Sequence, residues 1–138
     1  MQDMQAAGGP AVQSLDHLVL TVRDLDRSIA FYQALGMRAE WFTPKGGAPR
    51  PALVFGAQKI NLHVLGAEFE PKAAQVAAGS ADLCFLSQTP LQEWAAHLAR
   101  AGIAIAQGPV ARTGAQGPIL SIYLRDPDGN LIEVSNRL

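Results

Sequence analysis

The sequence has little of several features that would point to particular classes of protein. Only one cysteine, Cys84, occurs among the 138 residues, so the chain cannot form an internal disulfide framework. Charged residues make up 17% of the chain, the formal net charge is −1, and the lysines and arginines are scattered singly. Because proteins that bind a nucleic-acid backbone gather their basic residues into a patch or stripe, we expect no nucleic-acid partner.

Long apolar runs are also missing. No stretch approaches the roughly 20 apolar residues that a membrane-spanning helix needs, so we expect no membrane partner. Residues 1–13 have neither a basic start nor an apolar run and do not resemble a signal peptide. Their small and polar residues, including Gly8, Gly9 and Pro10, predict a flexible leader. The single thiol and the missing signal favour a cytoplasmic setting.

The remaining residues, 14–138, suffice for one compact domain, and apolar residues make up 49% of the chain. Residues 15–22 alternate as a strand does, and Asp24 can cap the helix that follows. Gly36 can end this helix. Three strand candidates come next, at residues 38–43, 52–56 and 59–65.

The same order of elements recurs in the second half of the chain. A strand is expected at residues 81–86, followed by a helix that begins in the capping box Thr89–Gln92, with Pro90 at its first position, and ends at Gly102. Strands are expected at residues 104–107, 119–125 and 131–135, and residues 126–130 have the chemistry of a turn.

The two halves therefore form an internal repeat of β-α-β-β-β pattern. The spacing supports it, because His17 and Gly36 are 19 residues apart and Asp82 and Gly102 are 20 apart. We predict an α+β fold with module one at residues 14–66, a linker at residues 67–79 and module two at residues 80–138.

Each predicted strand has an apolar face, suited to packing under a helix, and a second face that carries ionisable groups. The second face could simply lie in water. However, His17 with Asp82 and His63 with Glu133 are expected to occupy equivalent positions in the two repeats. Imidazoles and carboxylates that converge are donors for Fe, Mn, Ni, Zn or Co, so these four residues are candidate metal ligands.

Other polar residues have two interpretations each. Tyr123 and Arg125 could orient an anionic or enolic substrate, or they could be an exposed pair at a strand end. The glycine-rich residues 112–117 could form a lid or a long hairpin loop. Asp82 could bind metal, or it could orient a histidine ligand instead.

Two longer motifs identify the chain as a member of a known superfamily. Residues 16–32 read DHLVLTVRDLDRSIAFY and residues 125–133 read RDPDGNLIE. Both resemble the vicinal oxygen chelate superfamily, which includes glyoxalases, bleomycin-resistance proteins and extradiol dioxygenases. KINLH at residues 59–63, FEPK at 69–72, GSADLCF at 79–85 and GPVARTG at 108–114 resemble its glyoxalase domain-containing protein 5 branch, related by label to type III dihydroxybiphenyl dioxygenases.

The resemblance implies paired βαβββ modules that form an eight-stranded open cup around one divalent metal ion, often across a homodimer. The implied metal ligands are His17, His63, Asp82 and Glu133. His17 and Glu133 match the superfamily motifs directly, and His63 matches by its place in the repeat. Asp82 departs from the pattern, because histidine is more common there, which leaves two histidines and one carboxylate as the core of the set.

Two functions follow from the resemblance. The first is a metal-dependent enzyme, either a ring-cleaving dioxygenase or a glyoxalase-like lyase, that acts on a small oxygen-chelating substrate. Glu133, when displaced from the metal, would be its general base, and Tyr123 and Arg125 would contact the substrate. The alternative is a metal-free protein that binds a small molecule or drug, as bleomycin-resistance proteins do.

Overall fold

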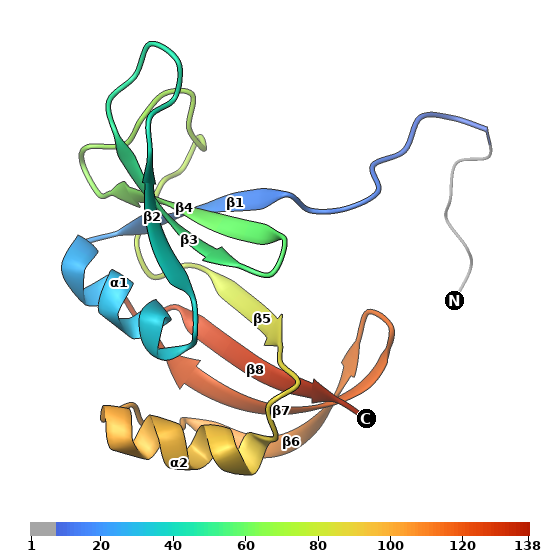
Figure 1. Ribbon diagram of the computed structural model, residues 1–138. Helices are drawn as coiled ribbons and strands as arrows, with labels where there is room; N and C mark the ends of the chain where they lie inside the picture. Colours follow the sequence, from blue (N-terminus) through green and yellow to red (C-terminus); the bar gives the residue numbers. More distant parts are fainter. Residues whose placement is uncertain (1–7) are drawn as a thin grey trace.

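The computed structural model describes residues 8–138 and contains two four-stranded sheets and two helices (Figure 1). The leader predicted at residues 1–13 lies partly outside the described residues. Its described part, together with residues 14–16, is exposed and forms neither helix nor strand. The expected fold class, two βαβββ modules, is confirmed.

Module one contains β1 (His17–Val22), α1 (Leu25–Ala34), β2 (Arg38–Phe42), β3 (Arg50–Phe55) and β4 (Gln58–Val64). The strand order in its sheet, sheet A, is β1-β4-β3-β2, with β1 and β4 parallel and the other pairs antiparallel. Asp24 caps α1 as expected, since its carboxylate accepts a hydrogen bond of 3.1 Å from the Arg27 amide.

Module two contains β5 (Asp82–Leu86), α2 (Leu91–Ala101), β6 (Gln107–Gly114), β7 (Gly117–Arg125) and β8 (Leu131–Arg137). Its sheet, sheet B, has the order β5-β8-β7-β6, with β5 and β8 parallel. The two sheets thus repeat one topology, and the first strand of each module is an edge strand.

The strand predicted at residues 104–107 is wrong, because β6 occupies Gln107–Gly114 instead. Gly108 and Pro109 suggest a turn when the sequence is read locally. In the structure they lie at an irregularity between Gln107 and Val110, and the rest of β6 pairs with β7. The glycine-rich residues 112–117 form the end of this hairpin rather than a lid, since Gly114 pairs with Gly117.

The capping box predicted at Thr89–Gln92 is also wrong. The N-cap of α2 is Pro90, and no side chain of the predicted box caps the helix. The free Leu91 amide instead donates a 3.0 Å hydrogen bond to Oδ1 of Asn136, which lies 45 residues away on β8. Gly102 ends α2 in the left-handed conformation, as expected.

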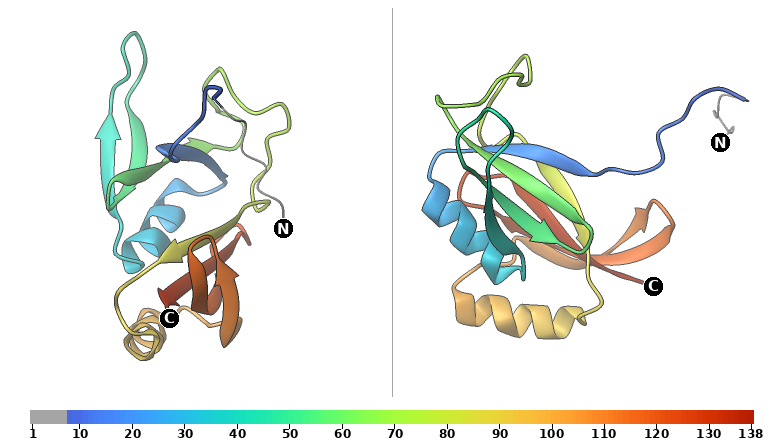
Figure 2. Two further views of the ribbon diagram at one scale, coloured as in Figure 1. Left: turned by 90° about the vertical axis from the view of Figure 1, so that its right-hand side faces the viewer. Right: turned by 45° about the horizontal axis from the view of Figure 1, so that its top comes forward.

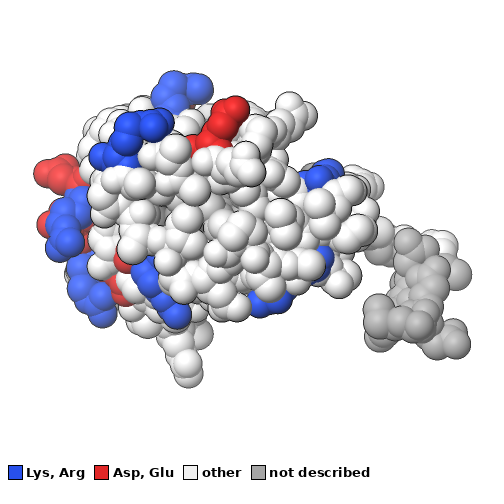
Figure 3. Space-filling view, turned by 90° about the horizontal axis from the view of Figure 1, so that it is seen from below, with Lys and Arg blue, Asp and Glu red and all other residues white. Residues whose placement is uncertain are grey.

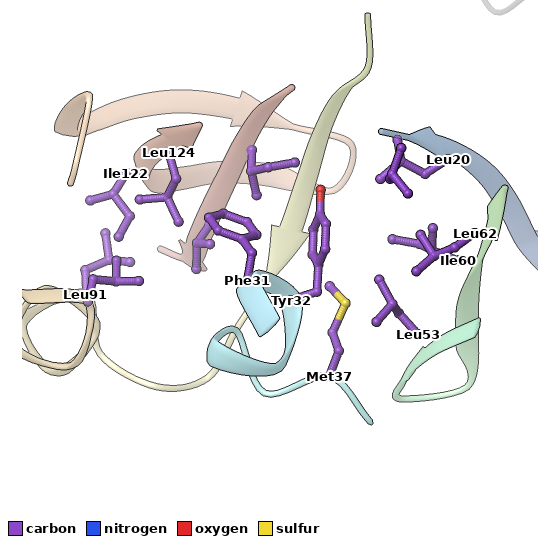
Figure 4. Packing of buried hydrophobic residues seen from close by; sticks show 14 residues of the cluster. Leu20, Phe31, Tyr32, Met37, Leu53, Ile60, Leu62, Leu91, Ile122 and Leu124 are labelled. Atoms are coloured by element: carbon purple, nitrogen blue, oxygen red, sulfur yellow. The ribbon is translucent and has the colours of Figure 1, made fainter. Parts of the chain in front are cut away.

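The core is one cluster that joins the two modules, and α1 lies between the two sheets (Figures 1 and 2). In Figure 4, Phe31 lies on the side of Ile122 and Leu124 from sheet B, and Tyr32 lies between Phe31 and the leucine and isoleucine side chains of sheet A. Both sheets therefore turn their apolar faces toward the helices. Their other faces, called the open faces here, carry the candidate site residues.

The surface agrees with the composition. The face seen from below in Figure 3 has a broad region without charged side chains, and basic groups are interspersed with acidic ones along one rim. Within residues 8–138 no helix is long and apolar enough to cross a membrane.

Candidate functional site

The open face of sheet B carries three rows of side chains that run across its strands. The first row is Asp82, Leu131 and Arg125; the second is Cys84, Glu133, Tyr123 and Gln107; the third is Leu86, Ser135, Ser121 and Val110. Glu133 lies in the middle row, with Asp82 one row away on the neighbouring strand. The sheet therefore brings together two of the predicted metal ligands.

Glu133 is held by two buried serine hydroxyls. Ser121 and Ser135 are fully buried, and each donates a hydrogen bond to Oε2 of Glu133. The two hydroxyl oxygens also lie 2.7 Å apart, and the Cys84 thiol contacts the Ser135 hydroxyl at 3.3 Å. Burial, as the main cause, raises the pKa of Cys84, so the thiol stays protonated near neutral pH. These contacts hold the Glu133 carboxylate in one orientation on the open face of sheet B.

Tyr123 is the direct cross-strand neighbour of Glu133. Its hydroxyl oxygen accepts a 2.9 Å hydrogen bond from Nε of Arg112, so its own proton is free to be donated elsewhere. Arg125, which was predicted to act beside Tyr123, lies in the row of Asp82 and donates to the Gly129 carbonyl at 3.2 Å. Arg112 was not singled out from the sequence, because only the β6–β7 hairpin places it next to Tyr123.

The open face of sheet A carries the other predicted ligands. On β1 and β4, His17 pairs with Lys59, Val19 with Asn61, and Thr21 with His63. His17 and His63 are therefore four residues apart along the strands, which is roughly 13 Å at about 3.3 Å per residue. The sheet places both histidines on one face but does not bring them together.

The register also identifies which residues of the two modules are equivalent. Asp82 pairs with Leu131, and Glu133 follows two residues later; His17 pairs with Lys59, and Asn61 follows two residues later. The module-one counterpart of Glu133 is therefore Asn61, and the expected equivalence of His63 with Glu133 is wrong by two residues.

Asn61 is a candidate that sequence reasoning missed. Its Oδ1 is buried and has no hydrogen-bond partner within the described residues. A buried acceptor of this kind is costly unless a partner is supplied. An amide oxygen can be a metal ligand, and Asn61 lies beside the strand of His17. The polar face of the strand was visible in the sequence, but the unpaired oxygen was not.

Each sheet thus carries half of a possible metal site. Over residues 8–138, no three His, Cys, Asp or Glu side chains come close enough to hold one ion. The exposed His17 bonds through Nδ1 to its neighbour Asp16 at 2.8 Å, which leaves Nε2 available as a ligand atom. The half-sites are His17 with Asn61 on sheet A, and Asp82 with Glu133 on sheet B.

His63 lies in different surroundings. It is 6% exposed, and its ring meets Phe69 edge to face with the centroids 5.4 Å apart. Phe69 also stacks under the guanidinium of Arg50, 3.9 Å from the ring centroid. Burial, followed by the positive charge of Arg50, lowers the pKa of His63, while Glu68 opposes the shift.

Comparison with known proteins identifies the family of the chain. Residues 14–134 match the model of the glyoxalase/bleomycin resistance protein/dioxygenase superfamily. The chain belongs to this superfamily. Virulence protein STM3117 of Salmonella typhimurium is 54% identical over 125 residues, which cover 90% of this chain and 84% of that protein.

Two further proteins have a similar sequence identity to this chain. Glyoxalase domain-containing protein RDO1 of Mycosarcoma maydis is 55% identical over 126 residues, covering 91% of this chain and 69% of that protein. The integron cassette protein VCH_CASS1, from the mobile metagenome of V. cholerae, has a solved structure with a TM-score of 0.86 and 57% identity. The match covers 92% of this chain and 97% of that one. The comparison of structures and the comparison of sequences thus indicate the same superfamily.

Proposed function

We propose that the protein is a divalent-metal-dependent enzyme of this superfamily that acts on a small substrate with two neighbouring oxygens. The metal would be held by His17 and Asn61 from sheet A and by Asp82 and Glu133 from sheet B. The observation that carries the proposal is the matching register: the two modules place these pairs at equivalent positions on their open faces.

The chemistry of the residues fits such an ion. One imidazole nitrogen, one amide oxygen and two carboxylates are donors that Mn, Fe, Co, Ni or Zn accept. The buried, unpaired Oδ1 of Asn61 would gain a partner. The two serine hydroxyls fix the Glu133 carboxylate before any ion arrives. His63 is left out of this set because its register separates it from His17.

A homodimer would complete the site if sheet A of one protomer faced sheet B of its partner. The open face of sheet A carries Arg50 and Lys59 but also Glu40, and that of sheet B carries Asp82 and Glu133 together with Arg112 and Arg125. Apolar side chains are uncovered on both faces, since Val19 is 47% and Leu86 51% exposed. The exposed apolar area favours a second copy as the cover.

A bound divalent ion would supply Lewis-acid stabilisation of charge on the substrate oxygens. The chain's own groups have separate tasks. Tyr123, whose oxygen is occupied by Arg112, can donate its proton to a substrate oxygen. Glu133 can accept a proton at Oε1, the oxygen that the serines leave free, only when this oxygen is displaced from the metal. Arg125 at the end of the same face would attract an anionic substrate.

The first test is the metal content of protein purified without chelator or metal affinity resin. About one ion per chain, lost in His17→Ala and in Glu133→Gln, is the expected result. Iron or manganese would point to a dioxygenase, and zinc, nickel or cobalt to a lyase or isomerase. A wild-type chain that neither contains nor takes up metal would refute the enzyme proposal and favour the metal-free binding protein.

Mixing the two variants tests the shared site. Each pure variant dimer would have both sites damaged. A mixed dimer of His17→Ala and Glu133→Gln chains would have one doubly damaged site and one intact site. Recovery of about one ion per mixed dimer is expected, measured after unfolding and refolding the variants together. If mixing restores no metal although the heterodimer forms, the ligands do not come from two chains.

A further inference from the structure

A cavity of about 400 Å³ lies between sheet A and the linker of residues 67–79. Val19 and Thr21 of β1 and His63 of β4 line one side of it, and Gln75, Val76 and Ala77 of the linker line another. Its volume falls within the range of small-molecule sites. None of the proposed metal-binding side chains lines it.

The linker is held over sheet A by specific contacts. Phe69 packs against both His63 and Arg50, and the carboxylate of Glu68 accepts hydrogen bonds from the Gly66 amide and from Nζ of Lys72. At the far end, the space beside Gly79 is filled by the Asp128 carbonyl, which an added Cβ would meet at 2.5 Å. The linker is therefore held over sheet A at both of its ends.

His63 is the unexplained polar group of this cavity. It is more than nine-tenths buried, and within residues 8–138 its ring contacts an aromatic face and nearby charges but makes no hydrogen bond. Its ring nitrogens are not among the fully buried atoms that lack a partner, so they remain open to solvent in the cavity. A ligand hydroxyl in the cavity could therefore form a hydrogen bond with this imidazole.

The other groups around the cavity describe what would fit. More than half of the lining residues are apolar, and the polar ones besides His63 and Lys72 carry hydroxyls (Thr21, Ser80) or amides (Gln75, Asn130). The one charged lining residue, Lys72, is already compensated, since its Nζ lies 3.3 Å from Glu68 and 3.9 Å from Glu70. An uncharged molecule is therefore favoured over an anion.

We propose that this cavity binds a small, largely apolar, uncharged molecule whose hydroxyl group hydrogen-bonds to His63. The inference is independent of the metal site, because binding requires neither Glu133 nor a metal ion. It assigns His63 a binding role in place of a metal-ligand role.

The test uses phenol and toluene as probes, since both fit the volume, neither chelates a metal, and only phenol has a hydroxyl group. Binding to the full-length, metal-stripped protein is followed by amide shifts in ¹H–¹⁵N NMR spectra. Phenol is expected to shift the amides of residues 73–77 and 80–81 in a saturable way, with toluene binding about two- to tenfold more weakly, as expected for one hydrogen bond. Equal affinities, or shifts confined to other regions, would overturn the proposal.

Variants test whether the phenol-induced amide shifts arise from binding in the cavity. Ala77→Phe should fill the cavity and abolish the phenol shifts, and Ala73→Phe from the same wall serves if that variant does not fold. Ala99→Phe on the exposed side of α2 is the matched control and should leave phenol binding unchanged. His63→Leu should remove the preference for phenol over toluene. Unchanged phenol binding in the filled variants would refute the site.

Glu133→Gln distinguishes this inference from the proposed enzyme function. It should lose metal and keep phenol binding, whereas His63→Leu should keep metal and lose the phenol preference. Metal binding and phenol binding can therefore be refuted independently.

Discussion

Tyr32 of α1 donates a 2.7 Å hydrogen bond to Oδ2 of Asp126, which lies 94 residues later in the turn before β8. Asp126 also accepts hydrogen bonds from the amides of Asp128 and Asn130 and from the Asn130 side chain. The Asn130 side chain in turn accepts from the Ala81 amide at the start of β5. One carboxylate thus ties the helix of module one to the turn and first strand of module two.

Tyr32→Phe should destabilise the fold by about 1.5–3 kcal/mol, because it removes a buried hydrogen bond to a charged group. Burial, aided by Asp126, holds the pKa of Tyr32 far above its ordinary value of 10.0, so the hydroxyl remains a donor over the usual pH range. Urea unfolding measures the loss. Tyr123→Phe, which removes a hydrogen bond outside the core, is the control with a smaller effect. A Tyr32→Phe loss no larger than that of the control would contradict this role.

Asn136→Ala should cost about 1–2 kcal/mol, the usual range for loss of a helix cap. Its Oδ1 accepts from the Leu91 amide, and its Nδ2 donates to the carbonyls of Ser87 and Thr89 at 2.9 Å each. Thr89→Ala should change stability by less than about 0.5 kcal/mol, since Thr89 makes no side-chain cap. Thermal or urea unfolding compares the two. A larger loss of stability in Thr89→Ala than in Asn136→Ala would support the capping box predicted from the sequence.

Ser121→Ala should weaken metal binding about 10–100-fold, because the hydroxyl orients the Glu133 carboxylate. Isothermal titration with Mn²⁺ or Zn²⁺ measures the change. Ser28→Ala is a matched control, since Ser28 is equally buried but its hydroxyl has no hydrogen-bond partner among the described residues. Equal affinities for the two variants would show that Ser121 does not support a metal ligand.

Glu68→Gln should loosen the linker. The Gly66 amide, more than Lys72, lowers the pKa of Glu68 from its ordinary value of 4.5. The carboxylate therefore stabilises the linker fully above pH 4.5, and this contribution is lost as the pH falls through the lowered pKa. Hydrogen exchange at residues 66–72 should be faster in Glu68→Gln than in Glu70→Gln at pH 7, and wild type should approach the variant in acid. Identical exchange in both variants would mean that the Glu68 carboxylate does not hold the linker.

Local sequence signals predicted most of the elements but not all of their contacts. The alternation of residues 15–22, the cap at Asp24 and the glycine at Gly102 act over a few residues, and the structure confirms the cap and the glycine and has the strand at His17–Val22. β6 was misplaced because Gly108 and Pro109 favour a turn locally, and pairing with β7 overrides that preference. The cap of α2 was missed for a similar reason, since its acceptor lies on β8.

The sequence by itself determined the repeat, the two apolar faces and the identity of the polar residues on the open faces. Only the tertiary structure decided which of these polar residues are neighbours. Pairing between β1 and β4 puts Asn61, not His63, next to the row of His17, and a shift of two residues moves a side chain about 6.6 Å along a strand. Hydrogen bonds between strands some 40 residues apart in the chain set this register, and no local pattern encodes it.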